Sequence, residues 1–483
     1  MVFNNNLLSK HDTEQGGLRM PEEILLIRDF IKEKAAIFGA DNSNDLLKSY
    51  IERNNTNPDA FSKGGAYFGF IHPEEDVSGP FHDFSLTISP DPDDKPWLVC
   101  LGVGTQGFKN DYELATFPGV RRLFQALIDE KGYCKSNFTD TENSLPRAFI
   151  SDVIHLKKSL DTNEYKKFLP CCQVVDDPLS DDGKKVISAF VAGYAKLREW
   201  PRNITQRSAV SAALNQVITT NKIDDDTTAF KLLTTRKFIV LEGAPGTGKT
   251  RLAKILAEKF GATSFFTQFH AETSYSDFIY GIKPKLNELT LNYEEQKGIF
   301  IEAIKYAKDN PLARVVLIID EINRANLANI LGPIFYLFEY KMVEDNVELE
   351  IGGGLKLKKV PDNFYVIGTM NTADRSLAVV DFALRRRFAW YTLKPKELHG
   401  ANFSKEDFEK FNEIFNWYAD SNELNLQPGQ AYFIADNEEE MKNRIKYELF
   451  PLIKEYLAEG LILKAKEEFN NYFMTRINKS LFE

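Results

Sequence analysis

The feature that most constrains this chain is a glycine-rich loop between an apolar run and a helix-compatible stretch. The apolar run, residues 237–241, reads Lys-Phe-Ile-Val-Leu. The loop that follows it is Gly243-Ala244-Pro245-Gly246-Thr247-Gly248-Lys249-Thr250. Glycines in such a loop let backbone N–H groups surround phosphate oxygens at the positive end of a helix. The pattern G-x-x-x-x-G-K-[ST] between a strand and a helix therefore predicts a nucleoside triphosphate site.

Polar residues at two places in the sequence complete this predicted site. Lys249 supplies a mobile cation for the β- and γ-phosphates. We also expect Arg251, two residues later, to bind the nucleotide. Asp320 and Glu321 end a second apolar run, residues 315–319, which fits a strand buried on both faces of a parallel sheet. We expect Thr250 and Asp320 to hold Mg²⁺, and Glu321 to polarise the water that attacks the γ-phosphorus.

Two later motifs extend the prediction. A third apolar run, residues 364–368, leads to Asn371, which we expect to hold the lytic water or sense the γ-phosphate. Arg385, Arg386 and Arg387 lie at the predicted end of a helix. They either complement the helix dipole or, in a ring-forming ATPase, reach a neighbouring subunit to neutralise transition-state charge. The order of the motifs favours the second interpretation.

Several stretches resemble the McrB family of AAA+ NTPases. Residues 320–327 read Asp-Glu-Ile-Asn-Arg-Ala-Asn-Leu, and residues 370–376 read Met-Asn-Thr-Ala-Asp-Arg-Ser. Residues 268–270, 274–279, 281–284 and 377–388 also match the family pattern, and the resemblance covers about residues 237–460. It implies an α/β AAA+ P-loop domain, with a parallel sheet flanked by helices, and a C-terminal helical lid.

The resemblance also implies an activity and its partners. Members of the family form a homo-oligomeric ring, a hexamer, which is usually driven by GTP. The ring works with a McrC-like subunit that carries a PD-(D/E)xK nuclease, and it cuts DNA that bears modified bases. On this basis Asn371 is the sensor, Arg386 and Arg387 are the arginines acting in trans, and Asp374 belongs to the guanine-nucleotide signature.

Three points stay open at this stage. Because Asn371-Thr372-Ala373-Asp374 follows the sensor strand, GTP rests on the resemblance alone and ATP is an alternative. Residues 429–433 read Gly-Gln-Ala-Tyr-Phe where the family commonly has Gly-His-Ser-Tyr-Phe, so the resemblance assigns no nucleotide contact to the lid. A MoxR-like ATPase that remodels a protein client is the alternative function.

The N-terminal part matches no recognition domain, and its pattern of short strands and helices predicts an α+β fold. We divide the chain into an N-terminal recognition domain of unknown ligand (1–200), a linker (201–230), the NTPase core (231–398) and the lid (399–483). Tyr67, Phe68, Phe70 and Trp97 could stack on a flipped base. The alternation around them favours a place in the core instead.

Charge and hydropathy limit the possible partners. The formal net charge is −10, and most of the acidic excess lies in the first 200 residues. DNA contact is therefore expected from a local patch or from a channel formed by several subunits. No apolar run reaches the roughly 18–20 residues needed to span a bilayer, and the N-terminus lacks the pattern of a signal peptide. We expect a cytoplasmic protein with no membrane partner.

Overall fold

The computed structural model describes residues 22–44, 46–62, 65–91, 96–152, 164–218, 225–287, 290–339, 348–352, 354–373 and 382–482. The chain divides into two compact units, Met1–Thr220 and Asn221–Glu483. The first unit contains an antiparallel sheet, and the second contains a parallel sheet followed by a helical C-terminal part.

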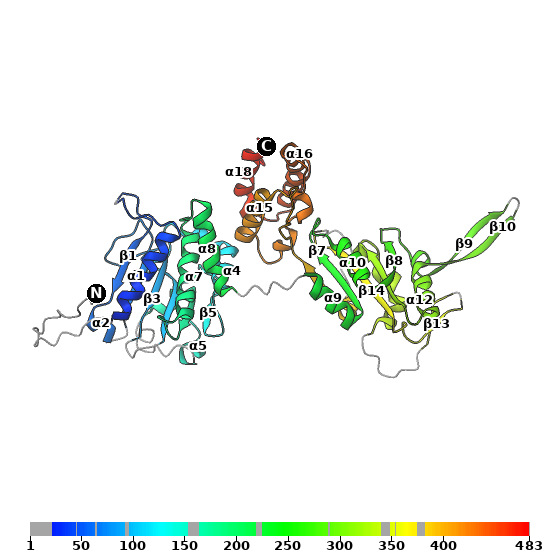
Figure 1. Ribbon diagram of the computed structural model, residues 1–483, viewed down its shortest axis with the longest axis horizontal. Coiled ribbons are helices and arrows are strands. Elements are labelled where there is room, and N and C mark those ends of the chain that lie inside the picture. Colours follow the sequence, from blue (N-terminus) through cyan, green and yellow to red (C-terminus); the bar gives the residue numbers. More distant parts are fainter. Residues whose placement is uncertain are drawn as a thin grey trace, which may run out of the picture. The chain divides into compact units, whose positions relative to one another are not determined.

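The sheet of the first unit has the strand order β1-β2-β3-β4-β6-β5, and every neighbouring pair is antiparallel. Its strands are β1 (Ile51–Asn55), β2 (Tyr67–Ile71), β3 (Phe84–Ser89), β4 (Trp97–Val103), β5 (Gly132–Cys134) and β6 (Cys171–Val175). Helices α1 (Glu22–Ile37) and α7 (Asp181–Leu197) pack on one face of the sheet (Figure 1). The side chains of β3 alternate between large apolar and hydroxyl residues, as a strand covered on one face requires. The predicted α+β fold is confirmed.

In the described part of this unit, the other α-helices are short, except α8. They are α2 (Pro58–Ser62), α3 (Tyr112–Thr116), α4 (Pro118–Gln125), α5 (Arg147–Asp152) and α8 (Ile204–Val217). Proline occupies the first turn of α4, where its missing N–H has no intrahelical partner to lose. The helix ends at Gln125 because the chain turns back into β5, with Gly132 N–H donating to the Asp129 carbonyl.

Two helices occupy much of the stretch predicted as a linker. Helix α8 starts with a capping box between Asn203 and Gln206 and packs on α7 in the first unit. Helix α9 (Asp225–Arg236) packs on β7 and α10 in the second unit. The structure therefore places the boundary between the units at residue 220, and not across 201–230. Each helix buries its apolar residues against its own unit, and this burial holds α8 on the first unit and α9 on the second.

The sheet of the second unit is parallel throughout, in the order β15-β7-β14-β11-β8. Its strands are β7 (Phe238–Gly243), β8 (Ala262–Gln268), β11 (Arg314–Asp320), β14 (Phe364–Asn371) and β15 (Ala389–Leu393). The buried run of β11 alternates between two cores, with Val316 and Ile318 on one face and Leu317 on the other. Helices cover both faces, which explains the continuous apolar runs in the sequence.

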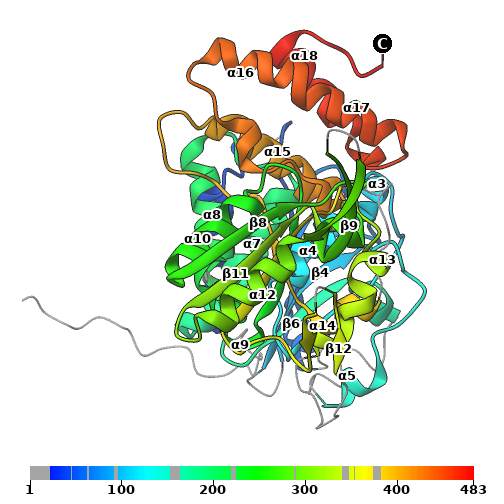
Figure 2. The same ribbon diagram turned by 90° about the vertical axis from the view of Figure 1, so that its right-hand side faces the viewer.

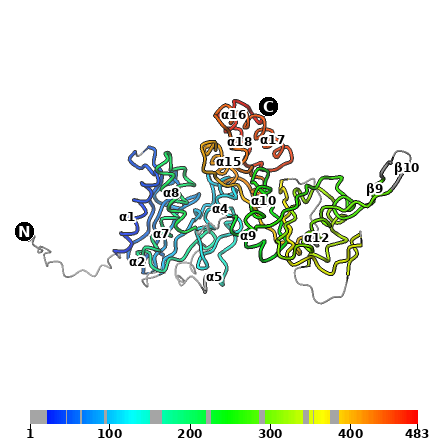
Figure 3. Tube along the Cα trace, turned by 45° about the vertical axis from the view of Figure 1, so that its right-hand side comes forward, coloured from blue at the N-terminus to red at the C-terminus, as the bar shows by residue number. Residues whose placement is uncertain are grey.

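The core that contains Val316 and Ile318 is covered by α9 and by α10 (Lys249–Lys259) (Figure 2). The second is closed by α12 (Ile299–Asp309), with contributions from α11 (Tyr275–Phe278) and α13 (Leu327–Leu331). Strands β9 (Tyr280–Asn287) and β10 (Thr290–Lys297) form an antiparallel hairpin that projects from this core (Figure 3). Strands β12 (Leu349–Glu350) and β13 (Lys356–Leu357) form a short pair, and α14 (Phe382–Arg387) precedes β15.

The C-terminal part of the second unit is helical and has its own core. Its helices are α15 (Lys405–Tyr418), α16 (Glu438–Arg444), α17 (Phe450–Ala458) and α18 (Lys466–Ile477). Phe411 makes edge contacts with the rings of Phe433 and Tyr472 inside this core. This part is the predicted helical lid. Among the described residues, none of the helices combines the length and the apolar character needed to cross a bilayer.

Candidate nucleotide site

The predicted glycine-rich loop joins β7 to α10, with the backbone bent at two glycines. Gly246 and Gly248 have φ values of 80° and 86°, which side chains other than glycine rarely allow. The residue at the N-cap of α10 is Gly248, which has no side chain to cap the helix. The first N–H groups of that helix therefore face the loop, as an anion site at a helix N-terminus requires.

Lys249 lies inside this loop and is 7% exposed. Its ammonium donates to the carbonyls of Gly243 and Ala244, both at 2.9 Å, and to Asn371 Oδ1 at 2.6 Å. The register of β7 and β14 pairs Gly243 with Asn371, and this places the predicted sensor next to the loop. The structure thus brings together Lys249, at the start of α10, and Asn371, at the end of β14, which are far apart in the sequence.

The hydroxyl of Thr250 and the carboxylate of Asp320 meet at the carboxyl ends of the strands. Thr250 Oγ1 donates to Asp320 Oδ1 at 2.7 Å, and Thr369 Oγ1 donates to the same oxygen at 2.6 Å. Asp320 is 8% exposed. A hydroxyl and a carboxylate form the hard oxygen donor set that suits Mg²⁺. The residues present therefore fit the expected metal.

Glu321 follows directly and adopts an unusual backbone conformation. Its φ of 54° and ψ of 46° lie in the left-handed region, which for a non-glycine residue stores about 1–3 kcal/mol of strain when held by its surroundings. The Glu321 N–H donates to Thr369 Oγ1 at 3.1 Å. Its carboxylate accepts from Asn371 Nδ2 at 2.7 Å and from Arg324 Nε at 3.4 Å. Asn371 therefore links the ammonium of Lys249 to the carboxylate of Glu321.

Comparison with known proteins agrees with this geometry. A family model described as AAA domain (dynein-related subfamily) matches residues 238–388. The EcoKMcrB subunit of a type IV methyl-directed restriction enzyme, from Escherichia coli strain K12, is 38% identical over 325 residues. The match covers 62% of this chain and 68% of that relative. The chain is a McrB-type AAA+ protein.

Two further similarities have been found for this McrB-type chain. Component YdiS of the type II restriction enzyme BsuMI, from Bacillus subtilis strain 168, is 31% identical over 193 residues. That match covers 32% of this chain and 56% of the relative's length. Among solved structures, a candidate ATPase from Cytophaga hutchinsonii is 20% identical, covers 50% of this chain and 68% of its own, and has a TM-score of 0.26.

The arginine cluster of this McrB-type protein separates into two environments. Arg387 is 8% exposed, forms an ion pair with Glu339 at 2.6 Å, and lies over the Phe335 ring. Arg386 also pairs with Glu339, at 2.7 Å, but its side chain is 66% exposed. Arg385 is exposed and stacks on Trp390. The sequence predicts the same role for Arg386 and Arg387, whereas in the structure Arg387 is buried and Arg386 is exposed to a neighbour.

The other predicted nucleotide residues lie at the edge of the site or outside the described part. Arg251 is exposed in the first turn of α10. Asp374 lies outside the described residues, so its predicted place near the base stays a prediction. Thr369 and Arg324 were not predicted as site residues, yet they contact the Asp320–Glu321 pair directly. Arg324 lies within the motif of residues 320–327, and Thr369 directly precedes the motif of residues 370–376.

The lid contacts the glycine-rich loop, which sequence analysis did not predict. Gly429 N–H donates to the Pro245 carbonyl at 2.8 Å, and Ala431 N–H donates to the Gly246 carbonyl at 3.0 Å. These bonds come from the stretch where the sequence departs from the family pattern. In this McrB-type chain, the lid therefore touches the backbone of the loop itself.

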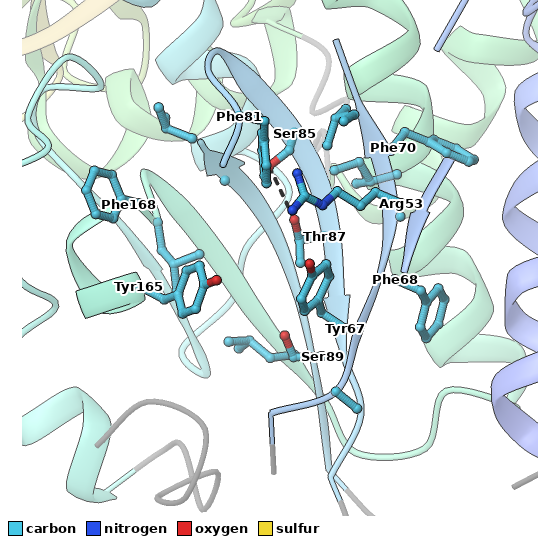
Figure 4. A pocket seen from close by; sticks show the side chains of 18 of the residues that line it. Arg53, Tyr67, Phe68, Phe70, Phe81, Ser85, Thr87, Ser89, Tyr165 and Phe168 are labelled. Atoms are coloured by element: carbon cyan, nitrogen blue, oxygen red, sulfur yellow. Dashed lines mark hydrogen bonds between the residues drawn. The ribbon is translucent and has the colours of Figure 1, made fainter. Parts of the chain in front are cut away.

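The first unit contains a cavity of about 90 Å³ on the sheet face opposite α1 and α7 (Figure 4). Residues with hydroxyl, aromatic and guanidinium groups line it: Arg53, Tyr67, Phe81, Ser85, Thr87, Ser89, Tyr165 and Phe168. Arg53 lies over the Phe81 ring, and its buried Nη1 has no hydrogen-bond partner among the residues that the structure describes. Phe68, Phe70 and Trp97 are at most 2% exposed, which confirms their predicted place in the core. Tyr67 is half-buried and points into the cavity.

Proposed function

We propose that this chain is the motor subunit of a McrBC-like restriction system, with GTP or ATP as its substrate and DNA as its target. In this proposal the cutting activity belongs to a separate McrC-like PD-(D/E)xK nuclease. The observation that carries the hydrolytic part is the link from Lys249 through Asn371 to Glu321. The similarity to two components of restriction enzymes supports a role in a restriction system, and it favours this role over that of a MoxR-like remodelling ATPase.

The side chains suggest how hydrolysis proceeds. Lys249 exchanges its bonds to the loop carbonyls for the β- and γ-phosphates when the triphosphate enters. Mg²⁺, held by Thr250 and Asp320, would neutralise charge on the phosphate oxygens. The carboxylate of Glu321 orients a water molecule for attack on the γ-phosphorus, the bond to the β-phosphate oxygen breaks, and inorganic phosphate leaves. Asn371 releases Glu321 for this task when Lys249 turns to the phosphates.

We propose that the site is completed by a neighbouring subunit in a homo-oligomeric ring, a hexamer as the family resemblance implies. The exposed Arg386 is the arginine that crosses the boundary, since Arg387 is buried against Phe335. A guanidinium supplied in trans acts mainly on transition-state charge. Assembly of the ring would therefore control turnover more than affinity.

For the first unit we propose DNA recognition, with a flipped base in the cavity lined by Arg53 and Tyr67. The aromatic walls offer stacking surfaces, and the hydroxyls of Ser85, Thr87 and Ser89 offer hydrogen bonds to the edge of a base. The buried Nη1 of Arg53 provides a donor for a carbonyl oxygen. Such local recognition is compatible with the net negative charge of the chain.

The test combines the purified chain with duplexes that contain cytosine or a modified cytosine, at a stated salt concentration. We expect hydrolysis of GTP or ATP, and faster hydrolysis or tighter DNA binding with one of the modified duplexes. Tyr67→Ala should abolish that preference while the unstimulated rate stays unchanged. Absence of triphosphate hydrolysis in the assembled wild-type protein would refute the motor role. Equal behaviour towards every duplex would refute base recognition.

A further inference from the structure

The lid holds the glycine-rich loop at three successive residues. Besides the two backbone bonds from Gly429 and Ala431, the side chain of Gln430 donates from Nε2 to the Thr247 carbonyl at 2.8 Å. The carbonyls of residues 245, 246 and 247 therefore all accept hydrogen bonds from one lid segment. A carbonyl that is bound on the outside of the loop leaves the neighbouring N–H groups free to turn inward, as phosphate binding requires.

Gln430 also ties the lid to the chain that leads out of the core. Its Oε1 accepts from the Lys396 N–H at 3.3 Å, three residues after the end of β15. Gln430 is 7% exposed, so both polar atoms of its amide form their hydrogen bonds in a buried place. One glutamine thus connects the loop, the core-to-lid connection and the lid.

The approach of the two segments is too close for ordinary side chains. A Cβ placed on Gly429 would lie 2.1 Å from the Gly246 carbonyl carbon, whereas real contacts stay above about 3 Å. The ring of Tyr432 covers Gly246 from the same side. The lid segment is therefore fitted to one conformation of the loop, and a rotation of the lid must change the loop's hydrogen bonds.

We propose that Gln430 is a positioning residue for the triphosphate: it acts through the backbone of the glycine-rich loop and couples lid orientation to nucleotide affinity. The inference rests on the proposed nucleotide site, but it concerns a residue that touches the loop only from outside. Coupling of this kind is reciprocal, so the nucleotide should in turn hold the lid segment in place.

The chain supplies a matched control three residues away. Gln427 is also a buried lid glutamine, at 5% exposure, and its amide donates to Asn412 Oδ1 within the lid. Gln430→Glu and Gln427→Glu both keep the length of the side chain and remove an amide donor. Only Gln430→Glu places a hydrogen-bond acceptor against the Thr247 carbonyl. Any general destabilisation of the lid is shared by the two variants.

The experiment measures dissociation constants for fluorescent GTP and ATP analogues by titration, together with melting temperatures without nucleotide. We expect Gln430→Glu to weaken binding about tenfold or more, since a buried donor is replaced by a repelling acceptor. Gln427→Glu should stay within about twofold of the wild type. Gln430→Met, which removes both amide groups at similar length, provides the same comparison if the charged variant does not fold.

Hydrogen exchange provides the reciprocal measurement. Saturating nucleotide should slow amide exchange at residues 429–432 in the wild type, and should do so less in Gln430→Met. Wild-type affinity in both Gln430 variants, or an equal loss in Gln427→Glu, would overturn the inference while leaving the nucleotide site intact. Failure of the wild type to bind either analogue would overturn the nucleotide site, and the inference with it.

Discussion

Replacing Thr369 by valine removes one hydroxyl from the strand end that holds Asp320 and Glu321. That hydroxyl donates to Asp320 Oδ1 at 2.6 Å and accepts the Glu321 N–H at 3.1 Å. Thr369 is 1% exposed, so no solvent replaces the lost group. Valine has nearly the same shape, and the change therefore isolates the two hydrogen bonds from packing.

The expected magnitude follows from these two bonds. A hydrogen bond to a charged group contributes about 1.5–3 kcal/mol, and each 1.36 kcal/mol that is felt in the transition state changes the rate about tenfold. Because the bonds set the carboxylate of Asp320 and the left-handed bend at Glu321, we expect kcat to fall about 10- to 100-fold. Nucleotide affinity should change little, since the loop and Lys249 are untouched. The melting temperature should fall by roughly 5 °C.

The assay is phosphate release at several triphosphate concentrations, which separates kcat from KM. Thr369→Ser keeps the hydroxyl and should restore most of the rate. Thr392→Val is the control for an exposed threonine of the same sheet, whose hydroxyl bonds to Glu242, and it should leave kcat unchanged. A valine variant with the wild-type kcat, or a serine variant as slow as valine, would refute the positioning role of Thr369.

Further predictions concern the nucleotide site, the arginine cluster and one buried carboxylate of the first unit, Asp83. Lys249→Ala should abolish tight triphosphate binding in a titration, because the loop loses its cation; near-normal affinity would contradict the site. Glu321→Gln should bind nucleotide normally but release phosphate about 10²-fold more slowly or worse, and turnover at the wild-type rate would exclude it as the water-orienting group. Arg387→Ala should lower the melting temperature, whereas Arg386→Ala should lower kcat only; the reverse pattern would contradict their assignment. Burial raises the pKa of Asp83, but N–H donors of Asp111, Lys109 and Asn110 outweigh this and hold the pKa below its usual value. The resulting stability is present above the unfolded pKa of about 4 and is lost as the pH falls through the lower folded pKa, so Asp83→Asn should flatten the decline of melting temperature below about pH 4.

The core of the motor could be predicted because its chemistry demands particular residues in a particular order. The three predicted apolar runs correspond to β7, β11 and β14, and the polar residues that follow them lie together at one edge of the sheet. Parallel strands present their carboxyl ends on the same side, so this proximity follows from the pattern alone. The hydrogen bonds of Asn371 to Lys249 and Glu321 could not be predicted from the pattern, because they depend on the register of β14 with β7.

Contacts between distant segments account for what the sequence did not reveal. Gln430 bonds to a residue 183 positions earlier, and Thr369 to one 49 positions earlier. Arg386 and Arg387 are neighbours with the same charge, and both pair with Glu339; only the packing of Arg387 over the Phe335 ring distinguishes them. None of these outcomes has a local signature.

In the ring that we propose, the hydrolytic site is shared between subunits, with Glu321 on one and Arg386 on the next. The most direct measurement mixes the Glu321→Gln and Arg386→Ala proteins, each inactive alone, and follows phosphate release as total protein concentration rises. Some interfaces in mixed rings then have an intact Glu321 facing an intact Arg386. We predict partial recovery of hydrolysis that increases with assembly. No recovery, in mixtures shown by native mass spectrometry to contain both variants, would contradict the claim.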